Sequence, residues 1–182
     1  MQVTATSTPL RLRLHSAAAH AAGVKTQGST VNLKELLPDL LPQAVDWAEA
    51  QSNLAALEGD SLNEFGLKLA RHVGVEQPEK IRIQLVSDFA LPVDQPLRDV
   101  VVRTGLLGPD MDGITLGHSV LIRRGHRRDI RLLSHEFRHV QQYEKYGSIT
   151  AFLNDYLWQI AEFGYRKAPL EEDARDHEVT EF

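Results

Sequence analysis

The sequence of 182 residues contains no cysteine. This excludes disulfide scaffolds, cysteine-ligated zinc ribbons, iron–sulfur centres and cysteine nucleophiles, so any bound metal must be held by nitrogen and oxygen ligands. Long apolar runs are also missing, because no segment approaches the roughly 18 apolar residues that a membrane span needs. We therefore expect no membrane partner and a cytoplasmic location. The net charge of −5 argues against nucleic acid as a partner, since general nucleic-acid binders are normally basic.

Acidic residues are missing from the first 34 residues, which are rich in serine, threonine and alanine. We expect residues 1–34 to form a disordered tail, and a transit peptide is the alternative interpretation of this composition. Over the whole chain, 42% apolar and 25% charged residues are typical of a globular domain. We therefore predict one domain over residues 35–178, followed by a short C-terminal end at 179–182.

Apolar spacing and capping residues predict six helices and two strands. The helices are expected at 42–58, from a cap at Asp60 or Ser61 to residue 73, at 97–107, at 129–146, at 149–163 and from Pro169 onward. Three consecutive valines within 97–107 also fit a strand, although we favour a helix. Alternating patterns predict strands at 81–85 and 118–124, with Gly113 and Gly117 bracketing a turn before the second. Helices outnumber strands and do not alternate with them, so we predict an α+β fold.

Residues 135–139 read HEFRH, which is an HExxH motif. On a helix, His135 and His139 lie on one face with Cβ atoms about 6 Å apart, so their imidazoles can bind one metal ion. Glu136 lies about 100° round the helix, where its carboxylate can take a proton from a metal-bound water. Zinc suits such a site, because it accepts imidazole and carboxylate ligands and lowers the pKa of bound water to about 7. The alternative is two surface histidines on an amphipathic helix that Asp129 caps.

Two histidines leave the metal site incomplete, so a third ligand decides its class. A metzincin would have glycine and histidine where this chain has Gln142 and Lys145, which excludes that class. A gluzincin takes a glutamate from a later helix, often in an E-x-x-A pattern. Glu171 stands in that pattern, and we prefer it to Glu172 and Asp173, which are otherwise explained as acids that favour a helix N-terminus.

Four segments between residues 115 and 171 carry a resemblance to known proteins. They are Thr115-Leu116-Gly117, the strand at 118–124, LLSHEFRHVQQ at 132–142 and YRKAPLE at 165–171. With these segments, residues 81–175 resemble the small bacterial gluzincin-type zincins, or minigluzincin-like domains. The resemblance implies a zincin-like fold that is mostly helical, with a small mixed sheet packed on the HExxH helix.

The resemblance also implies a metal site with one zinc ion, Zn²⁺. Its ligands would be His135, His139 and Glu171, and Glu136 would be the general base. Gln142 matches a glutamine that commonly follows the second histidine in these domains.

The chain departs from the family pattern at Arg175, where gluzincins often carry an acid four residues after the glutamate ligand. That acid can orient a histidine ligand, a role that Asp176 or Asp155 can take here. Five arginines between residues 123 and 131 form a basic cluster. We expect this cluster to be a solvated loop or an intramolecular partner of the acidic C-terminal segment.

The implied function is that of a zinc metallopeptidase, which hydrolyses peptide bonds with a zinc-activated water and a glutamate general base. Its partner would be a peptide or protein substrate, paired by strand addition along the strand from His118 to Arg124 if that strand is at a sheet edge. Tyr165 can hydrogen-bond the oxyanion of the tetrahedral intermediate, and simple packing is the alternative for this side chain. Two other functions remain open: a non-catalytic binding or structural module on a zincin scaffold, and a zinc hydrolase of a non-peptide amide.

Overall fold

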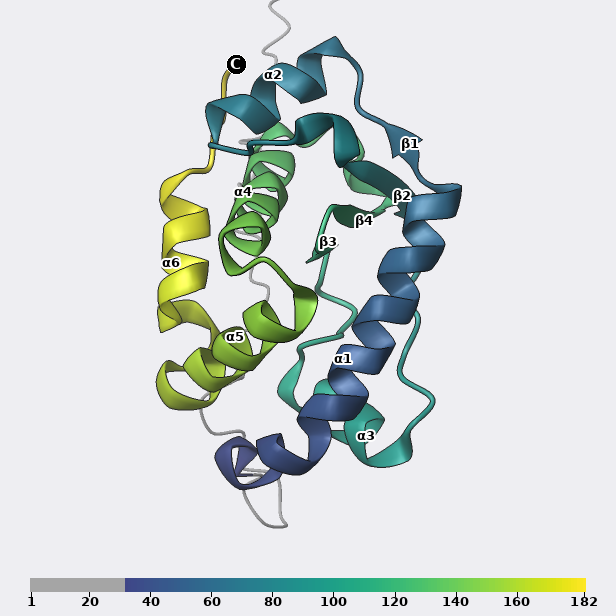
Figure 1. Ribbon diagram of the computed structural model, residues 1–182, viewed down its shortest axis with the longest axis vertical. Helices are drawn as coiled ribbons and strands as arrows, with labels where there is room; N and C mark the ends of the chain where they lie inside the picture. The colour runs from purple at the N-terminus through teal and green to yellow at the C-terminus, as the bar shows by residue number, and fades with distance from the viewer. Residues whose placement is uncertain (1–31) are drawn as a thin grey trace, which may run out of the picture.

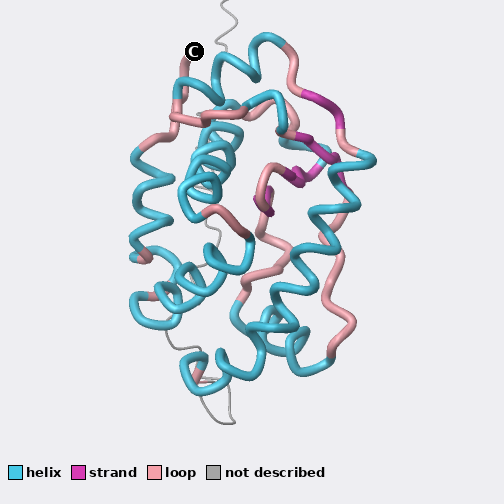
Figure 2. Tube along the Cα trace, in the orientation of Figure 1, coloured by secondary structure: helices cyan, strands magenta, loops and turns pink. Residues whose placement is uncertain are grey.

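The computed structural model describes residues 32–182 (Figure 1). Within this part of the chain, six helices surround a small sheet of four short strands, as Figure 2 shows. The helices are α1 (Leu33–Glu58), α2 (Glu64–His72), α3 (Gln95–Thr104), α4 (Ile130–Tyr146), α5 (Ile149–Phe163) and α6 (Pro169–Asp176). The strands are β1 (Asp60–Ser61), β2 (Arg82–Val86), β3 (Gly113–Leu116) and β4 (Ser119–Arg123), and 3₁₀ turns cover Pro78–Lys80, Arg124–His126 and Tyr165–Lys167. The predicted α+β class is confirmed.

The sheet has the strand order β1-β2-β4-β3. β2 and β4 run parallel, whereas β1 and β3 pair antiparallel with their neighbours, so the sheet is mixed. Alternate residues of β4 point to opposite faces. Val120 packs in a cluster with side chains of α2 and α4, while Leu121 packs in another with side chains of α1 and α5. Helices therefore cover β4 on both faces, which explains why almost the whole strand is buried.

Helix α4 is fixed by its ends and by one apolar stripe. Asp129 Oδ1 accepts a hydrogen bond from Leu132 N at 3.1 Å, which satisfies a free amide of the first turn, and Gly147 ends the helix at φ +76°. Leu133, Phe137 and Val140 are buried in the core beneath the sheet. Burial of this stripe fixes the direction of the opposite flank of α4, which carries His135 and His139.

Several elements differ from the sequence prediction, and the helix predicted at 97–107 is α3, which covers Gln95–Thr104. Helix α1 begins at Leu33 and contains Pro38 and Pro42, because burial of side chains in its first turns outweighs the amide hydrogen bonds that proline cannot make. Asn63, not residues 60 or 61, caps α2, accepting from Gly66 N at 2.9 Å. Residues 60 and 61 instead form β1 against β2. Residues 113–116 form β3 where we expected only a turn, because pairing with β4 supplies hydrogen bonds that a four-residue pattern does not reveal.

The predicted disordered tail at 1–34 lies outside the described residues except for 32–34, of which Leu33 and the next residue are helical. At the other end, the segment after residue 178 packs on the domain: Val179 contacts the core, and the Phe182 ring lies edge-on to Phe65 of α2, with centroids 5.7 Å apart. Among residues 32–182, no helix combines the length and the hydropathy that crossing a lipid bilayer requires.

Candidate metal centre

Helices α4 and α6 bring three side chains to one point. His135 and His139 are one turn apart on α4, and Glu171 comes from the first turn of α6, which Pro169 begins. One ligand atom from each of the three residues lies within 4.8 Å of the others. The structure therefore brings together the three residues that the sequence predicted as metal ligands.

The separations in this cluster match a metal site. His135 Nε2 lies 3.2 Å from His139 Nε2 and 3.6 Å from Glu171 Oε2, and His139 Nε2 lies 3.3 Å from Glu171 Oε1. A tetrahedral zinc ion with bonds of about 2.0–2.1 Å places its ligand atoms roughly 3.3–3.4 Å apart. Two imidazoles and one carboxylate also form a donor set that zinc accepts, so the residues present fit this metal.

Charge in the cluster is arranged as a buried ion pair. Burial opposes ionisation of Glu171, which is 1% exposed, but the charges of the two histidines and a hydrogen bond from Tyr156 outweigh it and lower the pKa of Glu171 to about 2. Burial also opposes a charged His139, but Glu171 and Glu136 outweigh this effect and raise the pKa of His139 to about 9. Below that pH, a metal must displace a proton from His139 to bind.

A chain of hydrogen bonds orients His139. Its Nδ1 lies 2.8 Å from Gln142 Oε1. The amide of Gln142 is itself fixed, since its Nε2 donates to Leu170 O at 2.9 Å and to Asp173 Oδ2 at 2.7 Å. Arg138 holds Asp173 through two further hydrogen bonds. Gln142 Oε1 therefore accepts the proton of His139 Nδ1, which leaves Nε2 free to bind a metal.

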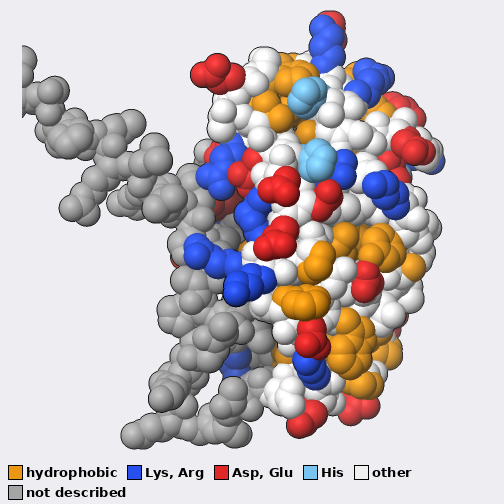
Figure 3. All heavy atoms as spheres, turned by 90° about the vertical axis from the view of Figure 1, so that its left-hand side faces the viewer, with side chains coloured by type: hydrophobic (Ala, Val, Ile, Leu, Met, Phe, Trp, Pro, Cys, Tyr) orange, Lys and Arg blue, Asp and Glu red, His pale blue; other side chains and the backbone are white. Residues whose placement is uncertain are grey.

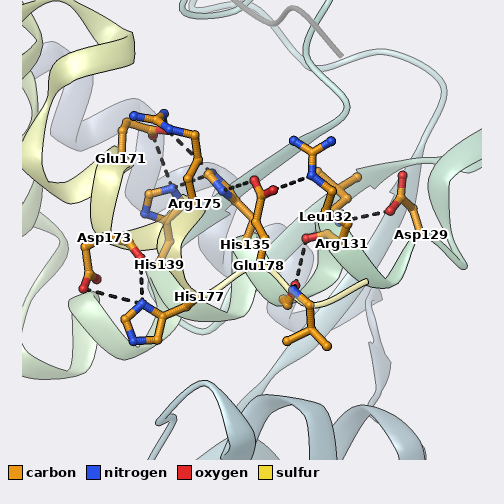
Figure 4. A network of polar contacts seen from close by, with 12 residues as sticks. Asp129, Arg131, Leu132, His135, His139, Glu171, Asp173, Arg175, His177 and Glu178 are labelled. Carbon is orange, nitrogen blue, oxygen red and sulfur yellow. Dashed lines mark hydrogen bonds and ion pairs between the residues drawn. The ribbon is translucent and has the colours of Figure 1, made fainter. Parts of the chain in front are cut away.

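The acid beside His135 is Glu178, which follows α6 and was not among the sequence predictions. Its Oε1 lies 3.2 Å from His135 Nδ1, at an ion-pair distance (Figure 4). We had expected Asp176 or Asp155 to compensate for the arginine at 175. Asp155 instead accepts from the Tyr146 hydroxyl and from a glutamine on its own helix, so it is not available to a histidine ligand.

Glu136 lies in a pocket formed by the edge strand β3. Gly113 and Thr115 point to the same face of this strand, toward α4. Thr115 Oγ1 lies 2.7 Å from Glu136 Oε2 and 3.0 Å from the Glu136 carbonyl oxygen, and it has one proton to donate. Burial raises the pKa of Glu136, although the charges of His135 and His139 and the Thr115 hydrogen bond lower it. Glu136 is thus a stronger base than an exposed glutamate, directly beside the candidate metal ligands.

Two further side chains contact the third ligand. Tyr156 of α5 donates to Glu171 Oε1 at 2.8 Å, and Arg175 Nη1 lies 3.4 Å from Glu171 Oε2. Tyr156 was missed in the sequence, although one signal was present: it shares an apolar helix face with Phe152 and Ile160, where a hydroxyl needs a partner. Arg175, which stands where gluzincins often carry an acid, pairs with the carboxylate of the candidate ligand Glu171.

Tyr165 opens the 3₁₀ turn before α6 and lines the same cavity as the histidines and both glutamates. Burial and the nearby charges of Glu171 and Glu136 raise the pKa of its phenol well above the usual value. Tyr165 is therefore a neutral O–H donor beside the cluster.

The strand at 118–124 is not at a sheet edge. Peptide pairing along this strand required a free sheet edge, but β4 pairs with β2 on one side and with β3 on the other, so the alternative of an internal strand is the correct one. Its backbone amides and carbonyls are therefore occupied. Among the described strands, β3 forms the sheet edge next to Glu136.

A cavity of about 630 Å³ extends from the cluster between β3, α1, α3 and α5. The histidines, Glu136 and Glu171 lie at its polar end, and most of the remaining wall is apolar. Representative wall residues are Leu37 and Leu40 of α1, Val101 of α3, Leu106 after it, Ile114 of β3 and Leu157 of α5.

Two arginines of the basic cluster at 123–131 form contacts within the chain. Arg123 donates to Met111 O and pairs with Asp88 at 2.9 Å, and Arg131 pairs with Glu178. The pair between Arg131 and Glu178 confirms, for one arginine, the expected pairing with the acidic C-terminal segment. On the face that carries α6, acidic and basic side chains are interspersed (Figure 3).

Comparison with known proteins gives no family for this chain. No family model matches it, and neither the curated proteins nor the solved structures show a significant match. Inferences about its function therefore depend on the geometry of the site and on the sequence resemblance.

Proposed function

We propose that this protein is a zinc-dependent metallopeptidase of the gluzincin type. The observation that carries the proposal is the convergence of His135, His139 and Glu171 at metal-ligand separations, with Glu136 buried beside them. A purely structural metal has no need of such a base and is usually enclosed by four protein ligands. Three ligands with an adjacent carboxylate are instead the arrangement of a hydrolytic site.

The chain's own residues divide the reaction between them. A zinc ion bound by the three ligands would supply a Lewis acid that polarises the scissile carbonyl and lowers the pKa of water. Glu136 takes the proton of the attacking water and passes it to the leaving amine. Thr115 holds the Glu136 carboxylate in place, and the neutral hydroxyl of Tyr165 donates to the oxyanion.

The outer edge of β3, which pairs with no other strand among residues 32–182, is the place for a peptide substrate. An extended peptide that adds to this edge makes backbone hydrogen bonds along residues 113–116, next to Glu136. The cavity beside β3 then accepts a large apolar side chain of the peptide, because most of its wall away from the cluster is apolar.

The Glu136→Gln variant tests the proposal. The substitution keeps the shape of the side chain and all three candidate ligands, so we expect one equivalent of zinc to bind. Peptide hydrolysis should fall on the order of 1,000-fold or more, since general-base catalysis supplies much of the rate. Metal content by elemental analysis and cleavage of a peptide library by mass spectrometry are the measurements. A wild-type protein that neither retains nor binds zinc would contradict the proposal, as would unchanged hydrolysis by the variant.

A further inference from the structure

The segment that follows α6 lies along α4, beside the first histidine of the motif (Figure 4). We propose that Glu178 is the positioning residue of His135 and that docking of residues 178–182 on α4 and α2 completes the metal site. This inference rests on the metal centre of the proposed function. In this inference, a segment that supplies no metal ligand, residues 178–182, orients the candidate ligand His135.

The geometry gives the two nitrogens of His135 different partners. Nε2 points to the cluster, 3.2 Å from His139 Nε2, whereas Nδ1 lies 3.2 Å from Glu178 Oε1. A carboxylate at Nδ1 favours the tautomer with the proton on that nitrogen, and Nε2 then keeps the lone pair that binds metal. Gln142 is hydrogen-bonded to His139 Nδ1, whereas His135 Nδ1 makes no hydrogen bond within the described chain and has the Glu178 carboxylate beside it at an ion-pair distance.

Glu178 is held from the other side by Arg131. The Arg131 Nε pairs with Glu178 Oε2, so the two carboxylate oxygens contact two different side chains of α4. His135 and Arg131 are one helical turn apart, and Glu178 lies between them (Figure 4). The side chain of Glu178 is only 17% exposed, which strengthens both contacts relative to a surface ion pair.

The residues after Glu178 hold the segment in place. Val179 N donates to Ser134 Oγ at 2.9 Å, and Ser134 is fully buried beside His135. Phe182 lies edge-on to Phe65 and His72 of α2, with centroid distances of 5.7 and 5.1 Å. These contacts lie outside the metal cluster, so undocking the segment would remove Glu178 while leaving His135, His139 and Glu171 in place.

The test compares zinc affinity, measured by competition with a chromophoric chelator, in the wild type and in variants of this segment. We expect Glu178→Ala to weaken zinc binding by 10- to 100-fold, the range typical for such outer residues. Glu178→Gln should lose less, because its amide oxygen still places a partial negative charge beside Nδ1. Phe182→Ala should also weaken zinc binding, because the segment that carries Glu178 is then docked on α4 for a smaller fraction of the time. Glu181→Gln, an exposed acid of the same segment, is the matched control and should bind zinc like the wild type.

A second readout does not depend on metal. Nitrogen-15 NMR of the histidine rings in the metal-free protein reports which nitrogen carries the proton, and we expect His135 to hold it on Nδ1 in the wild type and to populate both forms in Glu178→Ala. Unchanged zinc affinity or an unchanged His135 ring in Glu178→Ala would overturn the inference. A wild type that binds no zinc would instead contradict the proposed function, while the NMR comparison would still decide whether Glu178 orients His135.

Discussion

Gly113 and Glu136 approach each other so closely that no side chain fits between them. A Cβ atom at residue 113 would lie 2.6 Å from Glu136 Oε1 and 2.9 Å from its Cδ, well inside van der Waals contact. The glycine therefore limits the position of the proposed general base from the side of β3. Its role is steric, since the residue lies in a regular strand.

We predict that Gly113→Ala displaces the Glu136 carboxylate and lowers kcat by on the order of 100-fold, because small misplacements of catalytic groups are costly. Zinc affinity should stay within a few-fold of the wild type, since the ligands lie on α4 and α6. Steady-state peptide hydrolysis and zinc titration measure the two effects. Gly125→Ala is the matched control, because a Cβ there meets no atom within 4 Å. Equal loss of activity in both variants would contradict the steric role.

The ion pair of the metal-free cluster predicts a pH dependence of stability. The pKa of His139 is raised from 6.5 to about 9, so its contribution is fully present below pH 6.5 and is lost as the pH rises through 9. We expect the free energy of unfolding to fall between these values by up to roughly 3 kcal/mol in chelator. Zinc affinity should rise over the same interval, because the metal replaces the proton.

Denaturant unfolding with chelator at pH 6.5 and pH 9 measures this change. The His139→Asn variant lacks the titrating group and should show a much flatter dependence. A wild type as stable at pH 9 as at pH 6.5 would refute the assignment.

At the scale of elements, Glu144 joins the end of α4 to the loop before β2. Its carboxylate accepts from Glu76 N at 2.7 Å and Gln77 N at 2.9 Å, and it lies 3.0 Å from His118 Nε2. The side chain is only 5% exposed. This carboxylate therefore satisfies two loop amides and fixes the helix that carries the motif histidines.

We predict that Glu144→Ala lowers the free energy of unfolding by about 1.5–3 kcal/mol, because two loop amides lose their hydrogen bonds to a charged group. Zinc stoichiometry at low temperature should be unchanged. Thermal and denaturant unfolding of the metal-free protein measure the loss. Lys145→Ala changes the neighbouring exposed residue and should cost less than 0.5 kcal/mol, as surface substitutions usually do. Similar losses in both variants would contradict this role.

The elements that the sequence predicted well are those with local signals. Helix α4 has a capping aspartate, a terminal glycine and the 135–139 motif within one segment, so its extent and its two histidines followed from spacing alone. Strand β3 lacks such signals, because it is short, begins with glycine and exists through pairing with β4. Tyr156 and Glu178 were missed because their roles depend on contacts between segments that only the folded chain brings together.

At the scale of the whole molecule, the cavity beside the cluster is bounded by elements far apart in the sequence, from α1 to the start of α6. Leu106 lies half-buried in its wall, between α3 and β3. We predict that Leu106→Trp fills part of this space and lowers kcat/KM by about 10-fold or more for peptides with large apolar side chains at the pocket position. Peptides with glycine or alanine there should be affected little.

Cleavage profiling of a peptide library in the wild type and the variant measures the shift in preference. Leu57→Trp is the control, since this leucine is 85% exposed and does not line the cavity. A uniform loss over all peptides would indicate that the cavity does not select the substrate side chain.

Strand β3 has one further consequence for how such an enzyme would discriminate among peptides. The strand to which a peptide is proposed to add also carries Gly113, which lies against Glu136, and Thr115, which is hydrogen-bonded to it. A peptide that pairs out of register would therefore disturb the strand that aligns the base. Mismatched peptides would bind and yet turn over slowly. The enzyme would then discriminate among peptides through kcat more than through binding affinity.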